Sequence, residues 1–249
     1  MNQSTITHKF ENLALQGMKQ AYMAQSEDIN YSSLSFEDRI SLLLDAQEMY
    51  LNNKRTALNL KFSRIKDKQA AIELIDYNTK RNLNRAQILS LASLDFIAHR
   101  QNIIITGKTG TGKSYIAQGF ANKAIRQGFK AFYIRTGTLL EEIRIAKHSG
   151  TYTNLLKKFS RFHLLILDDF AMTPLSGDEA ASLFEIVEDR TEINSTIITS
   201  QLPVKEWYDI LNNPTIADAL LDRIVHSSHR IELEGESIRK SKAIINDFS

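Results

Sequence analysis

Short segments rich in apolar and β-branched residues recur along the chain and predict the strands of a sheet. They span residues 102–106, 131–135, 164–167, 195–199 and 229–233. The stretches between them place apolar residues at helical spacing, as in 115–126, 138–147 and 217–225. Strands that alternate with helices in this way predict an α/β domain built around a parallel sheet.

The chain before Gln69 has a different pattern, with one glycine, no proline and no strand-like segment, so we expect helices there. A first short helix is predicted around Phe10 to Met18. A second begins at Ser35, which is a good N-cap with Asp38 in the capping-box position. Four apolar residues then follow the spacing of a buried stripe: Phe36, Ile40, Leu43 and Leu44.

The segment after the first predicted strand matches the phosphate-loop pattern G-x-x-x-x-G-K-[ST] without a mismatch. It consists of Gly107, Lys108, Thr109, Gly110, Thr111, Gly112, Lys113 and Ser114, with Tyr115 next in the predicted helix. Backbone N–H groups of such a loop surround phosphate oxygens, Lys113 carries positive charge to the β- and γ-phosphates, and Ser114 supplies a hydroxyl to Mg²⁺. The sequence therefore predicts a nucleoside triphosphate site.

The apolar run 164–167 is closed by two acids, Asp168 and Asp169, which is the Walker B arrangement. Parallel sheets hold ligands at the carboxyl ends of their strands, so both carboxylates are expected near the phosphate loop. Asp168 is predicted to hold Mg²⁺ through water. Asp169 is predicted to orient and deprotonate the attacking water.

The segment 195–199 is followed by Ser200 and Gln201. We interpret Gln201 as a sensor of the γ-phosphate or of the attacking water, with Ser200 as the alternative. Because this strand comes late in the chain, we expect it to lie between the phosphate-loop strand and the Asp168 strand. That arrangement is typical of the additional-strand class of P-loop ATPases, with the strand order 5-1-4-3-2.

Arg223 lies on a short amphipathic helix far from the phosphate loop in sequence. One interpretation is an arginine finger that completes the ATP site of a neighbouring subunit. The other is an ion pair with Asp222 or another acid of the same chain. The residues alone leave both interpretations open.

The amino-acid composition and net charge limit the classes of protein to which the chain can belong. Apolar residues make up 43% and charged residues 24%, as in ordinary globular proteins, and the absence of cysteine excludes disulfides and thiolate metal sites. No apolar run approaches membrane-spanning length, so we expect a cytoplasmic protein without a membrane partner. The net charge of +2 is too small to indicate nucleic acid by itself.

Basic residues are concentrated between Asn52 and Lys68, where Lys54, Arg55, Lys61 and Arg64 stand against a single acid, Asp67. Such a helix is suited to a phosphate backbone, and a solvated helix face is the alternative. We place the domain boundary near Asp76, with a helical domain over 1–75 that contacts DNA, a partner or other copies. Residues 76–249 would form the ATPase domain.

In this order the motifs resemble those of the IstB-like helper ATPases of insertion sequences, a branch of AAA+ proteins close to the DnaC-type helicase loaders. The resemblance covers nearly the whole chain. It rests on segments 34–39, 42–46 and 82–87, on the phosphate loop and 164–169, and on 201–207, 220–226 and 235–239.

The resemblance implies an ATPase that uses ATP and Mg²⁺, oligomerises on duplex DNA without sequence specificity, and recruits an IstA-type transposase to choose an insertion target. It places Arg223 at the arginine-finger position, acting in trans. It also directs the basic excess between Lys123 and Arg161 toward DNA, including Arg144, Lys147, Lys157 and Lys158. The alternative is a DnaC-type helicase loader that uses ATP as a switch. The neighbouring gene would distinguish the two functions, since a transposase gene favours the first and a helicase or primase gene the second.

Three departures from the family pattern carry expectations of their own. Asp169 stands where glutamate is common, so we expect slow hydrolysis that depends on DNA and oligomer. Gln201 stands where asparagine is usual. Only ten residues follow Arg239, so we expect a missing or truncated helical lid. Arg239 is then either a partial substitute for the lid's sensor arginine or a residue that faces DNA or solvent.

Overall fold

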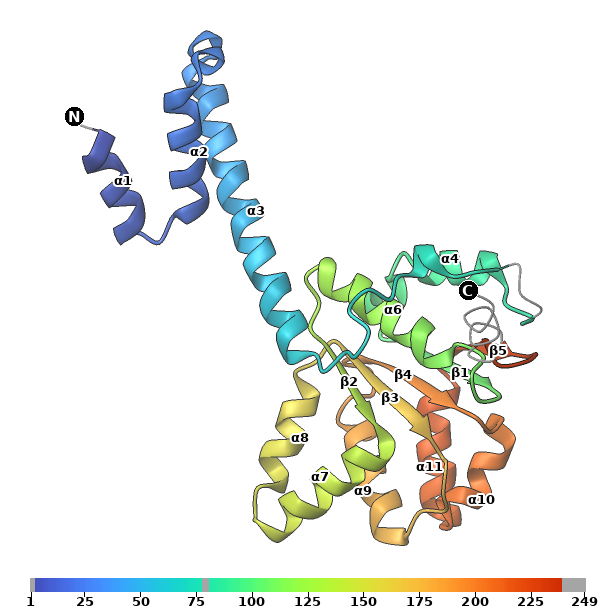
Figure 1. Ribbon diagram of the computed structural model, residues 1–249. Helices are drawn as coiled ribbons and strands as arrows, with labels where there is room; N and C mark the ends of the chain where they lie inside the picture. The colour runs from blue at the N-terminus through green and yellow to red at the C-terminus, as the bar shows by residue number, and fades with distance from the viewer. Residues whose placement is uncertain (1–2, 78–80, 239–249) are drawn as a thin grey trace, which may run out of the picture. The chain divides into compact units, whose positions relative to one another are not determined.

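The computed structural model describes residues 3–77 and 81–238, and its chain divides into two compact units, 1–58 and 59–249 (Figure 1). The division falls inside one long helix. The sequence placed a boundary later, near Asp76. The difference arises because the segment 59–75 packs on the sheet unit: Ile65, Ile72 and Ile75 are buried in its core.

The first unit is helical. It contains α1 (Gln3–Asn12), α2 (Gln16–Glu27), the 3₁₀ turn η1 (Ile29–Ser33) and most of α3 (Phe36–Phe62). The predicted cap of α3 is present, since the Asp38 N–H donates to Ser35 Oγ at 3.1 Å. Helices α2 and α3 approach closely at Gly17, where an added Cβ would lie 2.4 Å from the Ala46 carbonyl oxygen. Gln47 Oε1 accepts the Gly17 N–H at 2.9 Å and fixes this contact.

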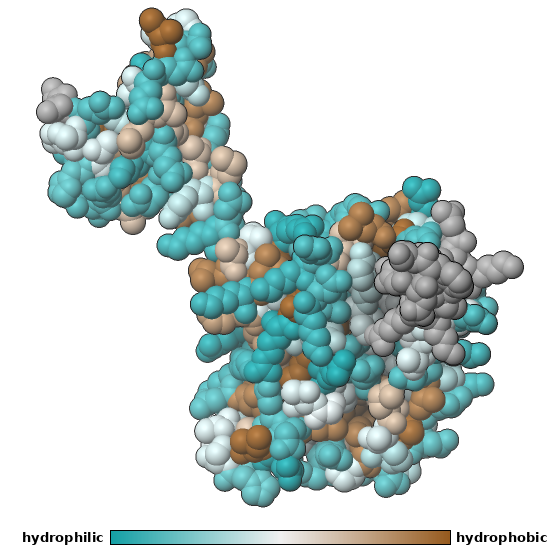
Figure 2. Space-filling view, in the orientation of Figure 1, coloured by the Kyte–Doolittle hydropathy of each residue, from teal (hydrophilic) through white to brown (hydrophobic). Residues whose placement is uncertain are grey.

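The prediction that the apolar stripe along α3 is buried is wrong. Leu43 is buried at 6% exposure, whereas Phe36 is 73% and Leu44 56% exposed, and Ile40 is also exposed. In the described residues of this unit, α3 contacts α2 at Gly17 and Gln25, and a stripe wider than that contact remains at the surface. Apolar side chains accordingly interrupt the hydrophilic surface of this unit (Figure 2).

The second unit is built on a five-stranded parallel sheet in the order β2-β3-β4-β1-β5. Its strands are β1 (Asn102–Gly107), β2 (Ala131–Arg135), β3 (Leu164–Phe170), β4 (Ser195–Ser200) and β5 (Ser228–Leu233). This is the predicted order 5-1-4-3-2 read from the other edge, and β4 lies between the strands of the phosphate loop and of Asp168. The sheet order confirms the additional-strand class.

Helices cover both faces of the sheet and make three layers (Figure 1). One face carries α4 (Arg85–Leu91), α5 (Asp95–Ala98), α6 (Lys113–Arg126) and the turn η2 (Ile72–Leu74). The other carries α7 (Thr136–His148), α8 (Tyr152–Ser160), α9 (Gly177–Glu188), η3 (Val204–Glu206), α10 (Trp207–Leu211) and α11 (Pro214–Val225). Strand residues alternate between the two cores, as Ile103 and Ile104 do, which explains the continuous apolar runs.

In the described part of the chain, each helix is too short or too polar to cross a membrane. The predicted absence of a full lid, and the role of Arg239, fall on residues outside the described ranges.

Candidate nucleotide site

The phosphate loop connects β1 to α6 in the predicted way, and its glycines are required by the backbone. Gly107, Gly110 and Gly112 have φ values of 146°, 83° and 100°, a region in which side-chain-bearing residues are strained. At Gly107 an added Cβ would also lie 2.3 Å from the Leu233 carbonyl oxygen of β5. The loop therefore combines a turn that needs glycine with close packing against the neighbouring strand.

Lys113 begins α6 and bends back over the loop. Its Nζ donates to the carbonyl oxygens of Gly107 at 2.6 Å and Lys108 at 2.9 Å. Thr111 Oγ1 donates to the same Lys108 oxygen at 2.8 Å, which tightens the turn. The ammonium group is thus held inside the curve of the loop, where a phosphate group would be bound.

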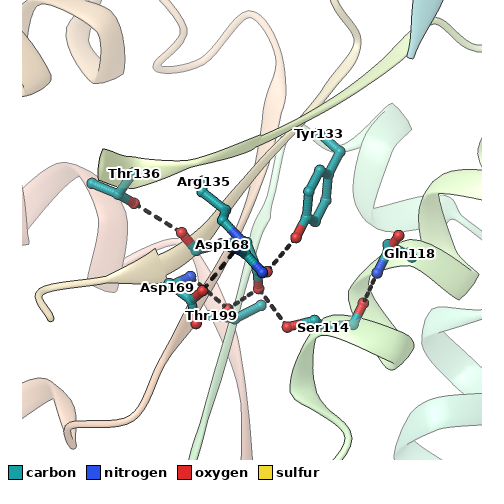
Figure 3. Close-up of polar contacts among 8 residues, drawn as sticks. All are labelled: Ser114, Gln118, Tyr133, Arg135, Thr136, Asp168, Asp169 and Thr199. Atoms are coloured by element: carbon teal, nitrogen blue, oxygen red, sulfur yellow. Dashed lines mark hydrogen bonds and ion pairs between the residues drawn. The ribbon is translucent and has the colours of Figure 1, made fainter. Parts of the chain in front are cut away.

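Asp168 lies at the carboxyl edge of the sheet, and the residue is 1% exposed. Three hydroxyl groups surround its carboxylate (Figure 3). Ser114 Oγ donates to Asp168 Oδ1 at 2.8 Å. Thr199 Oγ1 donates to the same oxygen, and the Tyr133 hydroxyl donates to Oδ2. The serine and the aspartate offer the hard oxygen ligands that Mg²⁺ prefers, so these residues fit the predicted metal.

Asp169 occupies an irregularity in β3, where the register against β4 shifts between Leu167 and Phe170. Its φ of 56° is unusual for a residue with a side chain, and such bulges re-aim side chains next to active sites. The Asp169 carboxylate lies toward Arg135 at the end of β2, with Oδ2 3.6 Å from Nε (Figure 3). The two predicted acids therefore point to different partners although they are adjacent in sequence.

Gln201 and Ser200, the two candidate sensors, have different surroundings: Gln201 borders the cavity and Ser200 is buried in the sheet. Gln201 follows β4, lines the same cavity as Lys113, and accepts a hydrogen bond from Thr109 Oγ1 at 2.6 Å. Ser200 is fully buried and donates instead to the Phe170 carbonyl oxygen at 2.8 Å. Of the two residues, Gln201 is the one that reaches the cavity.

A cavity of about 470 Å³ lies between the phosphate loop and the residues Leu74 to Asp76. Leu74, Ile75, Tyr115 and Ile238 supply apolar surface there, and Asp169 and Gln201 lie at its polar end. Arg81 borders the loop, where its Nη1 donates to the Thr111 carbonyl oxygen at 3.3 Å. Burial lowers the pKa of this guanidinium from its ordinary value.

Arg223 lies at the opposite end of β1, in the wall of a second cavity of about 800 Å³. Asn102 and Ser227 border the same cavity, and the Asn102 N–H donates to the Ser227 oxygen at 2.8 Å. The Arg223 guanidinium forms a two-pronged ion pair with Glu188 and lies 5.4 Å from the Phe184 ring centre. Its Nη1 is also 3.8 Å from Asp222.

The structure divides the residues predicted to bind DNA into two groups. Four are paired with acids: Arg64 and Lys158 with Glu142, Arg144 with Glu141, and Lys147 with Asp178. Within the described residues, no carboxylate lies within ion-pair distance of Lys54, Arg55, Lys61 or Lys157. Lys157 and Lys158 line a hollow of about 460 Å³ with Lys130 and Arg161.

Sequence reasoning missed Tyr133, Thr199, Arg135 and Arg81 at this site. Tyr133 and Thr199 read as ordinary strand residues, because aromatic and β-branched side chains are common in strands. What could have identified them is their position: both lie toward the carboxyl ends of the strands that flank the Asp168 strand, where parallel sheets bind ligands. Burial and the bond to Asp168 raise the pKa of the Tyr133 phenol, so it remains a donor in solution near neutral pH.

Comparison with known proteins adds the family context. Residues 8–244 match the family of IstB-like ATP binding proteins. The insertion sequence ATP-binding protein y4pL of Sinorhizobium fredii is 38% identical over 94% of this chain and 95% of its own length. The ATP-binding protein of insertion sequence IS1162 from Pseudomonas fluorescens is 37% identical over 82% and 87%.

Solved structures show the same fold at lower identity. DnaI superimposes with a TM-score of 0.57 at 20% identity, covering 67% of this chain and 92% of DnaI. The DnaC helicase loader gives 0.56 at 19% identity, covering 68% and 99%. The replication initiator DnaA bound to AMPPCP and single-stranded DNA gives 0.58 at 19% identity, covering 74% and 56%.

Proposed function

The chain belongs to the family of IstB-like ATP-binding proteins, and we propose that it is a transposition helper ATPase that assembles on duplex DNA. ATP binding, the insertion-sequence context and the AAA+ fold follow from the family and the fold. Hydrolysis, self-assembly, DNA binding and recruitment of an IstA-type transposase are the proposed part.

The observation that carries the proposal is the separation of the phosphate loop from Arg223. The loop follows the carboxyl end of β1, and the Arg223 cavity borders its amino end at Asn102. A strand of this length spans roughly 17 Å. Arg223 is therefore out of reach of the phosphates bound by its own chain, and its cavity is suited to the nucleotide edge of a neighbouring copy.

Within one chain the site supplies the remaining chemistry. Lys113 neutralises the phosphates, and Ser114 with Asp168 holds the Mg²⁺ that supplies further charge stabilisation when bound. Asp169 lines the cavity beside Arg135, where its carboxylate would orient and deprotonate the attacking water. Gln201 lies beside Thr109 of the loop, where its amide can contact the γ-phosphate or that water.

DNA binding is assigned to the basic residues that the fold leaves without acidic partners and to those around α8. Lys130, Lys157, Lys158 and Arg161 gather at one hollow, and such clusters bind phosphate backbones without reading sequence. In an assembly, many modest contacts of this kind add up along one duplex.

The test is the size of the particle formed with a non-hydrolysable ATP analogue and plain duplex DNA, measured by analytical ultracentrifugation and electron microscopy. We expect nucleotide-dependent oligomers from the unmodified chain and from Arg230→Ala, a control at an exposed arginine of β5 that lies outside the basic segments. Arg223→Ala should bind the analogue normally and remain unassembled. Assembly of Arg223→Ala at the same analogue concentration would remove its role in trans.

The partner is tested separately from the assembly. Addition of the protein with ATP should stimulate strand transfer by an IstA-type transposase into plasmid DNA at dispersed sites. A helicase loader would instead retain a replicative helicase on DNA, and a helicase or primase gene beside its own would favour that function.

A further inference from the structure

The Asp168 carboxylate is held from three separate elements, only one of which belongs to the phosphate loop (Figure 3). Ser114 and Thr199 both donate to Oδ1, from α6 and β4. Tyr133, on β2, is the donor that the structure places at Oδ2. The two carboxylate oxygens are thus fixed from opposite neighbouring strands, and this sets the plane of the group.

Tyr133 is well suited to hold that plane. The residue is 3% exposed, and its ring is buried in the core beneath α6, so the hydroxyl position is set by packing. A tyrosine side chain has few rotatable bonds, so little conformational freedom is lost in making the contact. The serine contact is less permanent, because Ser114 Oγ is the predicted metal ligand and has to serve the ion as well.

We propose that Tyr133 is a positioning residue for Mg²⁺-nucleotide binding, which orients Asp168 so that its free lone pairs face the metal-bound water. This inference rests on the proposed Mg²⁺-nucleoside triphosphate site. Tyr133 is not among the residues that line the cavity at the phosphate loop, so it would act through Asp168. Hydrogen-bond partners of metal-binding groups commonly change metal affinity by 10–100-fold when removed.

The test is the Mg²⁺ dependence of nucleotide binding by Tyr133→Phe in the full chain. Affinity for a fluorescent ATP analogue is measured in EDTA and over a Mg²⁺ series, with thermal unfolding checked in parallel. We expect the EDTA affinity to stay within about twofold, while the half-saturating Mg²⁺ concentration rises about tenfold. The hydrolysis rate should fall at low Mg²⁺ and recover at high Mg²⁺.

The matched control is Tyr152→Phe, which also removes a tyrosine hydroxyl that donates to a carboxylate, Glu185 Oε2, at 2.7 Å. This pair lies between α8 and α9, so the control should leave the Mg²⁺ dependence unchanged.

Two results would overturn the positioning role. The first is an unchanged Mg²⁺ midpoint in Tyr133→Phe. The second is an equal loss of affinity with and without Mg²⁺, which indicates a general structural effect. Failure of the unmodified chain to bind the nucleotide at all would instead refute the proposed function.

Discussion

Arg190 is a buried arginine whose replacement has a cost that the structure allows us to estimate. It lies just after α9 and is 1% exposed. Its guanidinium donates to the carbonyl oxygens of Phe159 at 2.6 Å, Phe162 at 2.9 Å and Ser195 at 2.6 Å, and its Nε donates to Thr196 Oγ1 at 3.2 Å. One side chain therefore joins the end of α8 to the start of β4.

Arg190→Met keeps a long apolar side chain but leaves three carbonyl oxygens without this donor. An orphaned buried polar group costs about 1–3 kcal/mol. Burial lowers the pKa of Arg190 to about 9, so the native residue is still charged at pH 7 and pays for desolvation. Relief of that desolvation offsets part of the loss, and we expect a net destabilisation of about 3–5 kcal/mol.

The assay is thermal unfolding of the full chain followed by circular dichroism. At about 2–4 °C per kcal/mol for a unit of this size, Arg190→Met should lower the Tm by about 10 °C. Arg161→Met, at an exposed arginine after α8, is the matched control and should change it little. A Tm for Arg190→Met within about 2 °C of that control would show that the carbonyl groups do not depend on the guanidinium.

Three further outcomes are expected. Asp169→Asn should keep ATP affinity and lower turnover at least about 100-fold in a phosphate-release assay; retained turnover would exclude Asp169 as the base. Lys54→Ala with Lys61→Ala should weaken duplex binding alike for all sequences, and reduce the log–log salt slope by about 2 in fluorescence anisotropy. Glu188→Gln removes the competing ion pair of Arg223, so assembly should need less ATP analogue in sedimentation; an equal or higher requirement would contradict this.

The sequence by itself determined the elements and the contiguous chemistry of this protein. The phosphate loop, the Asp168 and Asp169 pair and the five strands are local patterns, readable because glycine conformation and strand burial are imposed over a few consecutive residues. The strand order also followed, because few topologies place a late strand beside the phosphate loop. The family resemblance favoured one of the two interpretations of Arg223, the arginine finger in trans.

Only the tertiary structure decided which distant side chains meet. Tyr133 and Thr199 come to Asp168 from separate strands, and Glu188 pairs with Arg223 across two helices. The local sequence pattern likewise did not predict that Phe36 is exposed. Nor did it predict which of the described lysines form ion pairs with carboxylates, as Lys147 does with Asp178. The physical reason is that burial and ion pairing depend on what packs opposite a residue, and the neighbouring sequence does not specify that partner.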